Sequence, residues 1–372
     1  MRICIDARNI RQSPSGLCRY AMHIVCGMAR IDKENEYLIL RDKRFRKKIV
    51  DNPNFRDIYD PLKDTGSVQN ALFGAFVVNP LKVDVFHSLN QVVPFGLKAK
   101  KIITTVHDLM WLEAPNLSLD SKLKAFGANL LAKTSFAYSY RRADYVISIS
   151  KATDSIFKKH YPELGHKSHI ISHHDVFFQD PKTTERFELD ELNNELPEKY
   201  IISLGNTKPY KNVDNAIRAF AKICDKHPNL GMVIAGRIDR REALSKLAES
   251  LNVLDKVYFL KRQVSENDLK LLIKKAIFMA FLSFYEGYGI PILEAISLGC
   301  PVLGSTVDIV VETSGGAAAY VDPHNIDEIA KMMEKIITEP DFREQLKQSG
   351  FDYLERIKAY DSLAMTHGLY VG

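Results

Sequence analysis

The residues whose types and spacing best suit chemistry lie between Ser283 and Val302, in the sequence SFYEGYGIPILEAISLGCPV. The apolar run Phe278–Leu282 comes directly before them and predicts a buried strand. Two glycines and a proline follow, and proline is well tolerated in the first turn of a helix. We therefore expect a strand, a glycine-rich turn and a helix that begins near Ile290. Free backbone N–H groups and the dipole at such a helix start favour a bound phosphate.

Two glutamates flank this expected anion site. Glu286 lies in the turn, and Glu294 lies about one helical turn into the helix. Carboxylates accept strong hydrogen bonds from hydroxyl groups. A nucleotide sugar has hydroxyls on both sides of its diphosphate, in the transferred sugar and in the ribose. Either glutamate alone would pass for an ordinary surface acid, but together in this context they indicate a nucleotide-sugar site.

This segment resembles the signature of the family 4 retaining glycosyltransferases, which are built on the GT-B fold. Their pattern, E-G-[FY]-G-x-P-x-L-E-A-x-x-x-G-x-P-V, is matched at each named position. The resemblance extends over nearly the whole chain. Its further matches are GLCRY at 16–20, His87, TVHD at 105–108, RAD at 142–144, SIS at 148–150, Gly205 with Lys211 and Asn212, Glu312, and GGAAAYVDP at 315–323. It implies two doubly wound, Rossmann-like α/β domains with parallel sheets that face each other across a cleft.

The resemblance also implies roles for single residues. Glu286 would contact the transferred sugar, Glu294 the ribose, and Lys211 the donor diphosphate. Lys211 suits this role physically, because a cation at a strand end can stabilise the leaving nucleoside diphosphate. His107 follows the expected strand Ile102–Val106 and would meet the donor sugar. The donor-binding set is completed by Gly16, Asn206, Arg237, Val264, Gly287, Tyr288, Gly289 and Ile290.

The chain departs from the family pattern at positions close to the expected diphosphate. Asn206 and Tyr210 stand where the family often has arginine, and Cys18 replaces a glycine of the first loop. His173-His174-Asp175 replaces a turn that usually contains glycine. The first two changes remove positive charge, so they predict weaker donor binding or a distinct subgroup.

The reaction implied by the resemblance is retention of anomeric configuration without a covalent nucleophile. The donor would be a GDP- or UDP-sugar carrying a hexose, with mannose or a similar sugar the best guess. The acceptor would be a glycan or lipid-linked glycan in surface polysaccharide synthesis. No Asp-x-Asp occurs in the chain, so the usual means of holding a divalent metal on a diphosphate is missing. The histidines between 160 and 174 are too irregularly spaced to suggest a metal site.

Short apolar runs alternate with helical patterns along the chain, as in βαβ units with parallel sheets. Strands are expected at Arg2–Ile5, Tyr37–Leu40, Val83–His87, Ile102–Val106, Tyr145–Ile149, Ile170–Ser172, Tyr200–Leu204, Gly231–Ala235, Val257–Leu260, Phe278–Leu282 and Pro301–Gly304. Helices are expected at Leu17–Ile31, Ser121–Arg141, Asn212–Cys224, Ile326–Ile337 and Phe342–Ile357, with a further one capped by Ser265. We predict an N-terminal, acceptor-side domain at 1–172, a linker at 173–199, and a nucleotide-sugar-binding domain at 200–352. By the resemblance, residues 353–372 form a helix that crosses back to the first domain.

Composition limits the remaining choices. The 372 residues carry a formal net charge of +5, and the five cysteines form no C-x-x-C pair, so a reducing, cytoplasmic compartment is expected. No motif suggests nucleic-acid binding. The longest apolar stretch is too short to span a bilayer, so contact with the inner membrane face would be peripheral, and the segment Lys43–Lys48 offers a basic cluster for it. The alternatives are a nucleotide-sugar-binding scaffold without catalysis and a GT-B epimerase. A glycosidase fits less well, because its two acids must flank one bond.

Overall fold

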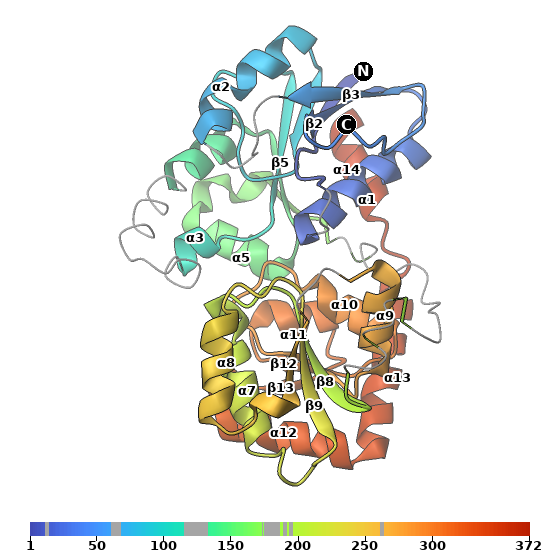
Figure 1. Cartoon of the computed structure of the whole chain (residues 1–372). Helices are drawn as coiled ribbons and strands as arrows, with labels where there is room; N and C mark the ends of the chain where they lie inside the picture. Colours follow the sequence, from blue (N-terminus) through green and yellow to red (C-terminus); the bar gives the residue numbers. More distant parts are fainter. Residues whose placement is uncertain are drawn as a thin grey trace. The chain divides into compact units, whose positions relative to one another are not determined.

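The structure is a computed structural model of the chain. It describes residues 1–11, 15–60, 68–114, 133–172, 174, 187–188, 192, 196–260 and 264–372. These residues form two compact units (Figure 1). The first unit holds the described residues of 1–114 and 133–174 together with Tyr360–Gly372, and the second holds the described residues of 187–359.

The first unit is built on a seven-stranded parallel sheet in the order β3-β2-β1-β4-β5-β6-β7. Its strands are β1 (Arg2–Asp6), β2 (Glu36–Asp42), β3 (Phe55–Asp60), β4 (Val85–Ser88), β5 (Lys101–Val106), β6 (Tyr145–Ser148) and β7 (Ser168–Ile170). Its helices include α1 (Gly16–Ile31), α2 (Val68–Val78), α3 (Met110–Glu113), α5 (Lys151–His160) and α14 (Ser362–Val371), and residues 133–142 are also helical. Apolar side chains from the middle of the sheet, such as Phe86 and Ile102, are fully buried against these helices.

The second unit has a six-stranded parallel sheet in the order β10-β9-β8-β11-β12-β13. Its strands are β8 (Lys199–Leu204), β9 (Leu230–Ala235), β10 (Val257–Phe259), β11 (Met279–Phe281), β12 (Val302–Ser305) and β13 (Ala319–Val321). Its helices include α7 (Val213–Ala221), α8 (Arg241–Ser250), α9 (Glu266–Lys275), α10 (Ile290–Ser297), α11 (Asp308–Ser314), α12 (Ile326–Thr338) and α13 (Pro340–Ile357). None of the helices that the structure describes has the length and apolar character needed to cross a bilayer.

Both units are therefore doubly wound α/β structures of the kind predicted, but several local predictions differ from the structure. Strand β3 was not predicted, because Arg56 and Asp57 break the apolar pattern of this edge strand. Helix α7 begins at Val213, because Asn212 has the left-handed φ of 56° and cannot continue a helix. Gly16 is the first residue of α1 rather than part of the preceding loop, since the Ser15 side chain caps the helix there.

The C-terminal stretch forms two helices where a single one was predicted. Helix α13 runs to Ile357 within the second unit, and α14 begins at Ser362 within the first. The Asp361 side chain accepts a hydrogen bond from the backbone N–H of Ala364 and so starts the new helix. Most of the predicted linker, and most of the helix predicted at Ser121–Arg141, lie outside the described residues.

Candidate active site

The candidate site is positioned by the point at which the second sheet reverses its strand order. Strand β8 pairs with β9 on one side and β11 on the other, and the chain winds away from β8 in both directions. Ligands of doubly wound sheets bind beyond the carboxyl ends of the strands at such a point. The loops that meet there are residues 205–212 after β8 and residues 282–289 after β11.

The backbone of the loop after β8 lies very close to the backbone of the loop after β9. Gly205 has a φ of 129° and Gly236, after β9, a φ of 115°, which residues with a side chain rarely adopt. A Cβ atom on Gly236 would overlap the carbonyl oxygen of Gly205 and lie 2.9 Å from its carbonyl carbon. The two glycines therefore let both strand-end loops pack together.

Lys211 and Glu286, which sequence analysis selected separately, form an ion pair in the structure. The Lys211 Nζ atom lies 2.5 Å from Glu286 Oε1, although the residues are 75 positions apart. Their side chains are 12% and 9% exposed. Ser283 donates a further hydrogen bond, of 2.6 Å, to the same carboxylate oxygen. The pair joins the two loops at the switch point and places opposite charges side by side with little water around them.

Aromatic rings support the cation of this pair. The Lys211 ammonium lies 5.0 Å from the ring centre of Phe281, the last residue of β11, and 5.4 Å from that of Tyr210. Contacts of this kind favour a positive charge. The two residues that depart from the family pattern also contact each other, because Asn206 Nδ2 donates a hydrogen bond of 2.8 Å to the Tyr210 hydroxyl. A neutral pair therefore helps to hold this loop beside the charge of Lys211.

Asn212 fixes the end of the same loop. Its side-chain amide is buried and donates to the carbonyl oxygens of Leu282, at 3.0 Å, and Pro323, at 2.8 Å. It thereby ties the loop after β8 to the segments that follow β11 and β13. The sequence motif contained Asn212 but did not reveal this role, whose only sequence signal is that asparagine tolerates a left-handed backbone.

The turn and helix predicted after β11 are present. Gly289 has a φ of 95° directly before α10, which begins at Ile290 with proline in its first turn. Glu294 lies in this helix and is 2% exposed. Gly287 and Tyr288 occupy the turn, where the Tyr288 carbonyl accepts a hydrogen bond from the Thr313 hydroxyl. A carboxylate buried at this point, one turn into a helix that follows a glycine turn, indicates a ligand site more strongly than an exposed acid does.

The remaining second-unit residues of the predicted set contribute in different ways. Arg237 follows β9, but its side chain is 68% exposed and pairs with Asp239 at 2.8 Å. Its carbonyl oxygen accepts a hydrogen bond from the N–H of Thr207, so the Arg237 backbone supports the loop after β8. Val264 is partly buried and directly precedes Ser265, which caps α9.

The other predicted residues, Gly16 and His107, belong to the first unit. Gly16 is exposed at the start of α1. His107 directly follows β5, and its Nε2 donates a hydrogen bond of 2.9 Å to the carbonyl oxygen of Leu89, which leaves Nδ1 as the acceptor. The Tyr20 ring meets the His107 ring edge-on, with 4.7 Å between their centres.

A buried polar chain continues from Tyr20 into the unit. The Tyr20 hydroxyl lies 3.1 Å from the Thr105 hydroxyl, which lies 2.9 Å from Nε2 of His87. The other ring nitrogen of His87 lies 2.6 Å from the hydroxyl of Tyr370 in α14. The C-terminal helix is thus linked through buried hydrogen bonds to the residue that packs on His107.

Sequence analysis missed a buried charge cluster at the carboxyl end of β1. The Arg8 guanidinium is fully buried and lies 2.5 Å from Asp6, 2.6 Å from Asp60 and 2.6 Å from the side-chain oxygen of Asn70. Buried charges persist when they are paired and hydrogen-bonded in this way. The cluster joins β1, β3 and α2, and no local spacing in the sequence could have revealed it.

Burial sets the charge of the two histidines in the first unit. It lowers the pKa of His107 from 6.5 to about 4, and it lowers the pKa of His87 to about 3, with His107 nearby adding to the second effect. Both imidazoles are therefore neutral near pH 7, and His107 keeps its single proton on Nε2.

A pH dependence of stability follows from the lowered pKa of His107. Between pH 6.5 and about 4 the unfolded chain binds this proton and the folded chain does not, so lowering the pH through that window reduces the free energy of unfolding. We expect urea unfolding at stepped pH to show a shallower decline for His107→Gln than for the unmodified chain. Equal slopes for the two proteins would show that His107 does not have a depressed pKa.

Comparison with known proteins finds a family match over the unit that holds this site. The family model for glycosyl transferases group 1 matches residues 184–352, which include both switch-point loops. Residues 184–352 are thus similar in sequence to the group 1 glycosyltransferases. The structure of WaaG, a glycosyltransferase of lipopolysaccharide biosynthesis, superposes over 100% of both chains with a TM-score of 0.73 at 18% identity, so this chain has the GT-B fold.

Two curated relatives of this chain are mannosyltransferases. The serotype-specific mannosyltransferase WbdA of Escherichia coli is 27% identical over 259 residues, which cover 66% of this chain and 30% of WbdA. The O-antigen chain mannosyltransferase RfbU of Salmonella typhimurium is 26% identical over 279 residues, covering 73% of this chain and 75% of RfbU. The chain thus spans about a third of WbdA and about three quarters of RfbU.

Proposed function

We propose that the chain is a retaining, metal-independent hexosyltransferase that uses a GDP- or UDP-sugar and acts in surface polysaccharide synthesis. The observation that carries the proposal is the Lys211–Glu286 pair at the switch point, 2.5 Å apart. It stands beside a helix N-terminus whose first turns hold the buried Glu294. The mannosyltransferase relatives support mannose, or a similar hexose, as the transferred sugar.

Each group then has one task in the proposed reaction. Lys211 and the N–H groups at the start of α10 stabilise the donor diphosphate. Glu286 accepts hydrogen bonds from the transferred sugar, and Glu294 accepts them from the ribose. His107, neutral near pH 7, is proposed to contact the donor sugar. Asn206 shapes the loop that carries Lys211 and adds no charge to it.

The proposed transfer needs no nucleophile from the protein. The bond between the anomeric carbon and the donor phosphate oxygen breaks, and a bond from the acceptor oxygen forms on the same face of the sugar. The acceptor hydroxyl gives its proton to the leaving phosphate oxygen. The charge that develops on the nucleoside diphosphate is stabilised by Lys211, so a divalent metal is not required in this scheme.

The proposed acceptor is a glycan or a lipid-linked glycan at the inner membrane face, where the protein would act from the cytoplasm. Support comes from the O-antigen role named for RfbU. The segment Lys43–Lys48 adds five basic side chains in six residues, and all five are exposed. Such a segment is attracted to anionic lipids.

The donor assignment is tested by thermal stabilisation. The compounds of a panel of nucleotides and nucleotide sugars are added one at a time. The true donor, at about 100 times its Kd, should raise the melting temperature by about 5–10 °C. The shift should persist in EDTA and disappear in Glu294→Ala, because the ribose hydroxyls lose their acceptor. The anomeric configuration of the product, read by NMR, then tests retention.

The control for Glu294→Ala is Glu249→Ala, which removes an exposed glutamate from α8 in the same unit. It should keep the full thermal shift. A shift that needs divalent metal would contradict metal independence, and a shift that survives Glu294→Ala would remove Glu294 from the donor site. Binding of a nucleotide sugar without transfer to any glycan or lipid-linked acceptor would favour a binding scaffold.

A further inference from the structure

Helix α2 exposes an unusual apolar face. Its eleven residues, VQNALFGAFVV, include no charged side chain. Leu72, Phe73 and Phe76 are 50%, 52% and 76% exposed, and Phe95 on the neighbouring loop is 38% exposed. Single exposed apolar residues are common, whereas a contiguous group of this kind marks an interaction surface.

The opposite side of α2 is firmly anchored, so this exposure is not due to a loosely attached helix. Asn70 is fully buried and accepts a hydrogen bond of 2.6 Å from Arg8 in the buried charge cluster. The N–H of Phe95 donates to the carbonyl oxygen of Ala71 at 2.7 Å. Gly74 packs so closely on Pro94 that a Cβ atom there would lie 2.8 Å from the proline ring. The fold therefore holds the aromatic side chains outward.

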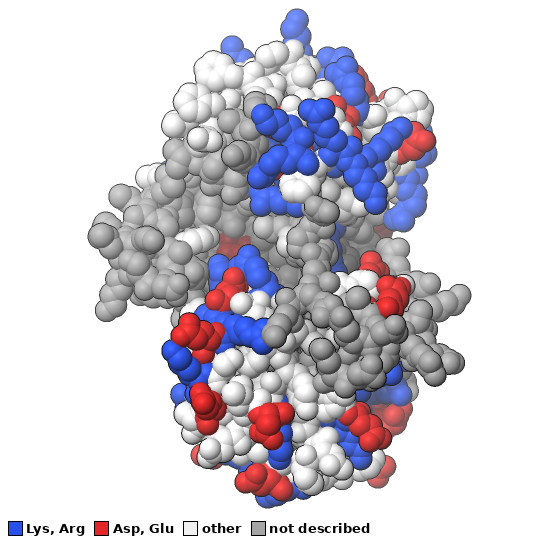
Figure 2. All heavy atoms as spheres, in the orientation of Figure 1, with Lys and Arg blue, Asp and Glu red and all other residues white. Residues whose placement is uncertain are grey.

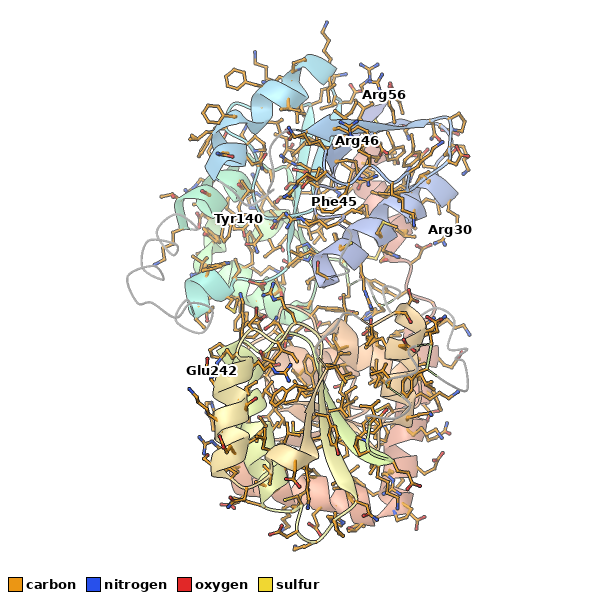
Figure 3. All side chains as sticks on the ribbon, viewed as in Figure 1. Arg30, Phe45, Arg46, Arg56, Tyr140 and Glu242 are labelled. Carbon is orange, nitrogen blue, oxygen red and sulfur yellow. The ribbon has the colours of Figure 1, made fainter. Side chains whose placement is uncertain are left out.

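Cations border the apolar face. The backbone amides of Lys82 and Lys98 both bond to Asn79, directly after α2, at 3.2 Å and 2.8 Å, and both lysine side chains are exposed. Figure 2 shows uncharged surface over α2 beside a gathering of lysine and arginine side chains on the same unit. Figure 3 places Phe45, Arg46, Arg56 and Arg30 in that gathering, on the segment after β2, on β3 and on α1.

We propose that α2 inserts Leu72, Phe73 and Phe76 into the interfacial layer of an anionic lipid bilayer, with Lys82 and Lys98 at the headgroups. An uncharged helix face with aromatic side chains, bordered by lysines, has the composition that such an interface favours. The basic segment Lys43–Lys48 of the same unit adds electrostatic attraction to anionic lipids. Three side chains are enough to bind a membrane, because each apolar side chain that inserts adds its own favourable free energy of transfer.

A second copy of the chain fits this face less well. A stable interface buries about 800 Å² on each partner, whereas the apolar face of an eleven-residue helix provides three large side chains. Two copies joined through α2 would also bring the cations around this face toward one another, which is unfavourable. An anionic bilayer removes the apolar side chains from water and places anionic headgroups beside the lysine side chains.

The inference deepens the proposed function by naming the element that contacts the membrane, and it rests on that function only for the location of the acceptor. Its test is cosedimentation of the full chain with vesicles of phosphatidylethanolamine and phosphatidylglycerol. The unmodified chain should bind them, and bind phosphatidylcholine vesicles much less. Phe76→Ser should weaken partitioning by roughly tenfold or more, and Phe73→Ser/Phe76→Ser further, because each phenyl ring no longer leaves water.

The matched control is Leu254→Ser, which removes a 40% exposed apolar side chain from the second unit and should not change binding. High salt screens the attraction between the basic side chains and the anionic lipids but leaves the insertion of apolar side chains. It should therefore weaken the binding of the unmodified chain and abolish the binding of the double variant, which has lost both phenyl rings. Failure of the unmodified chain to bind, or equal binding by Phe76→Ser, would overturn the proposal. A dimer in sedimentation velocity that Phe76→Ser converts to a monomer would assign the face to a second copy instead.

The donor site provides an independent readout. Nucleotide-dependent thermal stabilisation should be the same in Phe76→Ser as in the unmodified chain, because α2 lies in the first unit and the donor residues Lys211, Glu286 and Glu294 lie in the second. Loss of vesicle binding with intact nucleotide binding thus tests α2 alone. Absence of nucleotide binding with intact vesicle binding would count against the proposed function and leave the membrane surface in place.

Discussion

Replacing Lys211 by alanine is expected to weaken nucleoside diphosphate binding by about 10–100-fold and to slow turnover of the nucleotide sugar by about 10²–10³-fold. The reason is geometric. Lys211 provides the cation of the ion pair that joins the loops after β8 and β11, with its Nζ atom 2.5 Å from Glu286. The two neighbouring positions where arginine is common in the family carry Asn206 and Tyr210, which bond to each other. Titration calorimetry with the nucleoside diphosphate measures the first effect and initial rates measure the second.

The control for this substitution is Lys222→Ala, since Lys222 is a half-exposed lysine of the same unit that pairs with Asp327. It should leave both quantities unchanged. A double variant, Lys211→Ala/Glu286→Gln, separates charge from structure, because it removes the carboxylate that Lys211→Ala leaves without its cation. Nucleotide affinity within about twofold of normal in Lys211→Ala would exclude this lysine from the diphosphate site.

Gly236→Ala is expected to lower the free energy of unfolding of the second unit by about 3–5 kcal/mol. Two effects combine at this position. The φ of 115° is unfavourable for alanine, and the added Cβ atom would overlap the carbonyl oxygen of Gly205. The overlap can be relieved only if the loop after β8 moves, and this loop carries Lys211. Nucleotide binding should therefore fall together with stability, as urea unfolding and calorimetry on the same protein would show.

Gly316→Ala separates the two effects. Gly316 has a φ of 83°, but a Cβ atom there would have no neighbour within 4 Å. This control should cost only the conformational part, about 1 kcal/mol, and leave nucleotide binding intact. Equal costs at the two glycines would show that the contact between Gly236 and Gly205 does not constrain the loop.

The sequence by itself predicted the parts of the protein that depend on neighbours along the chain. The alternation of apolar runs and amphipathic stretches predicted two doubly wound sheets, because βαβ units follow from local periodicity. The turn before α10, with Gly289 and Glu294, was predicted for the same reason, since a glycine turn and a helix start are encoded within a few residues. The cap at Ser265 is a further local signal that the structure confirms.

Where local signals were mixed, the predictions failed. Strand β3 was missed, because charged side chains interrupt the apolar pattern of an edge strand that is covered less completely than the centre of the sheet. The single C-terminal helix was also wrong, because the cap of α14 at Asp361 uses one side-chain hydrogen bond that an apolar pattern does not register.

Only the tertiary structure decided which distant residues meet. Lys211 and Glu286 are 75 positions apart, and they form a pair because β8 and β11 are neighbours in the sheet order. Arg8 meets Asp60 and Asn70 because the ends of β1 and β3 and the helix α2 converge at one end of the first sheet, although β2 lies between β1 and β3. The exposure of Phe73 and Phe76 is likewise decided by packing, because Asn70 on the opposite side of α2 is buried and leaves these two rings facing water. Local free energies select helices, turns and strands, whereas contacts between distant residues depend on how whole elements pack, and a single sequence does not state that packing.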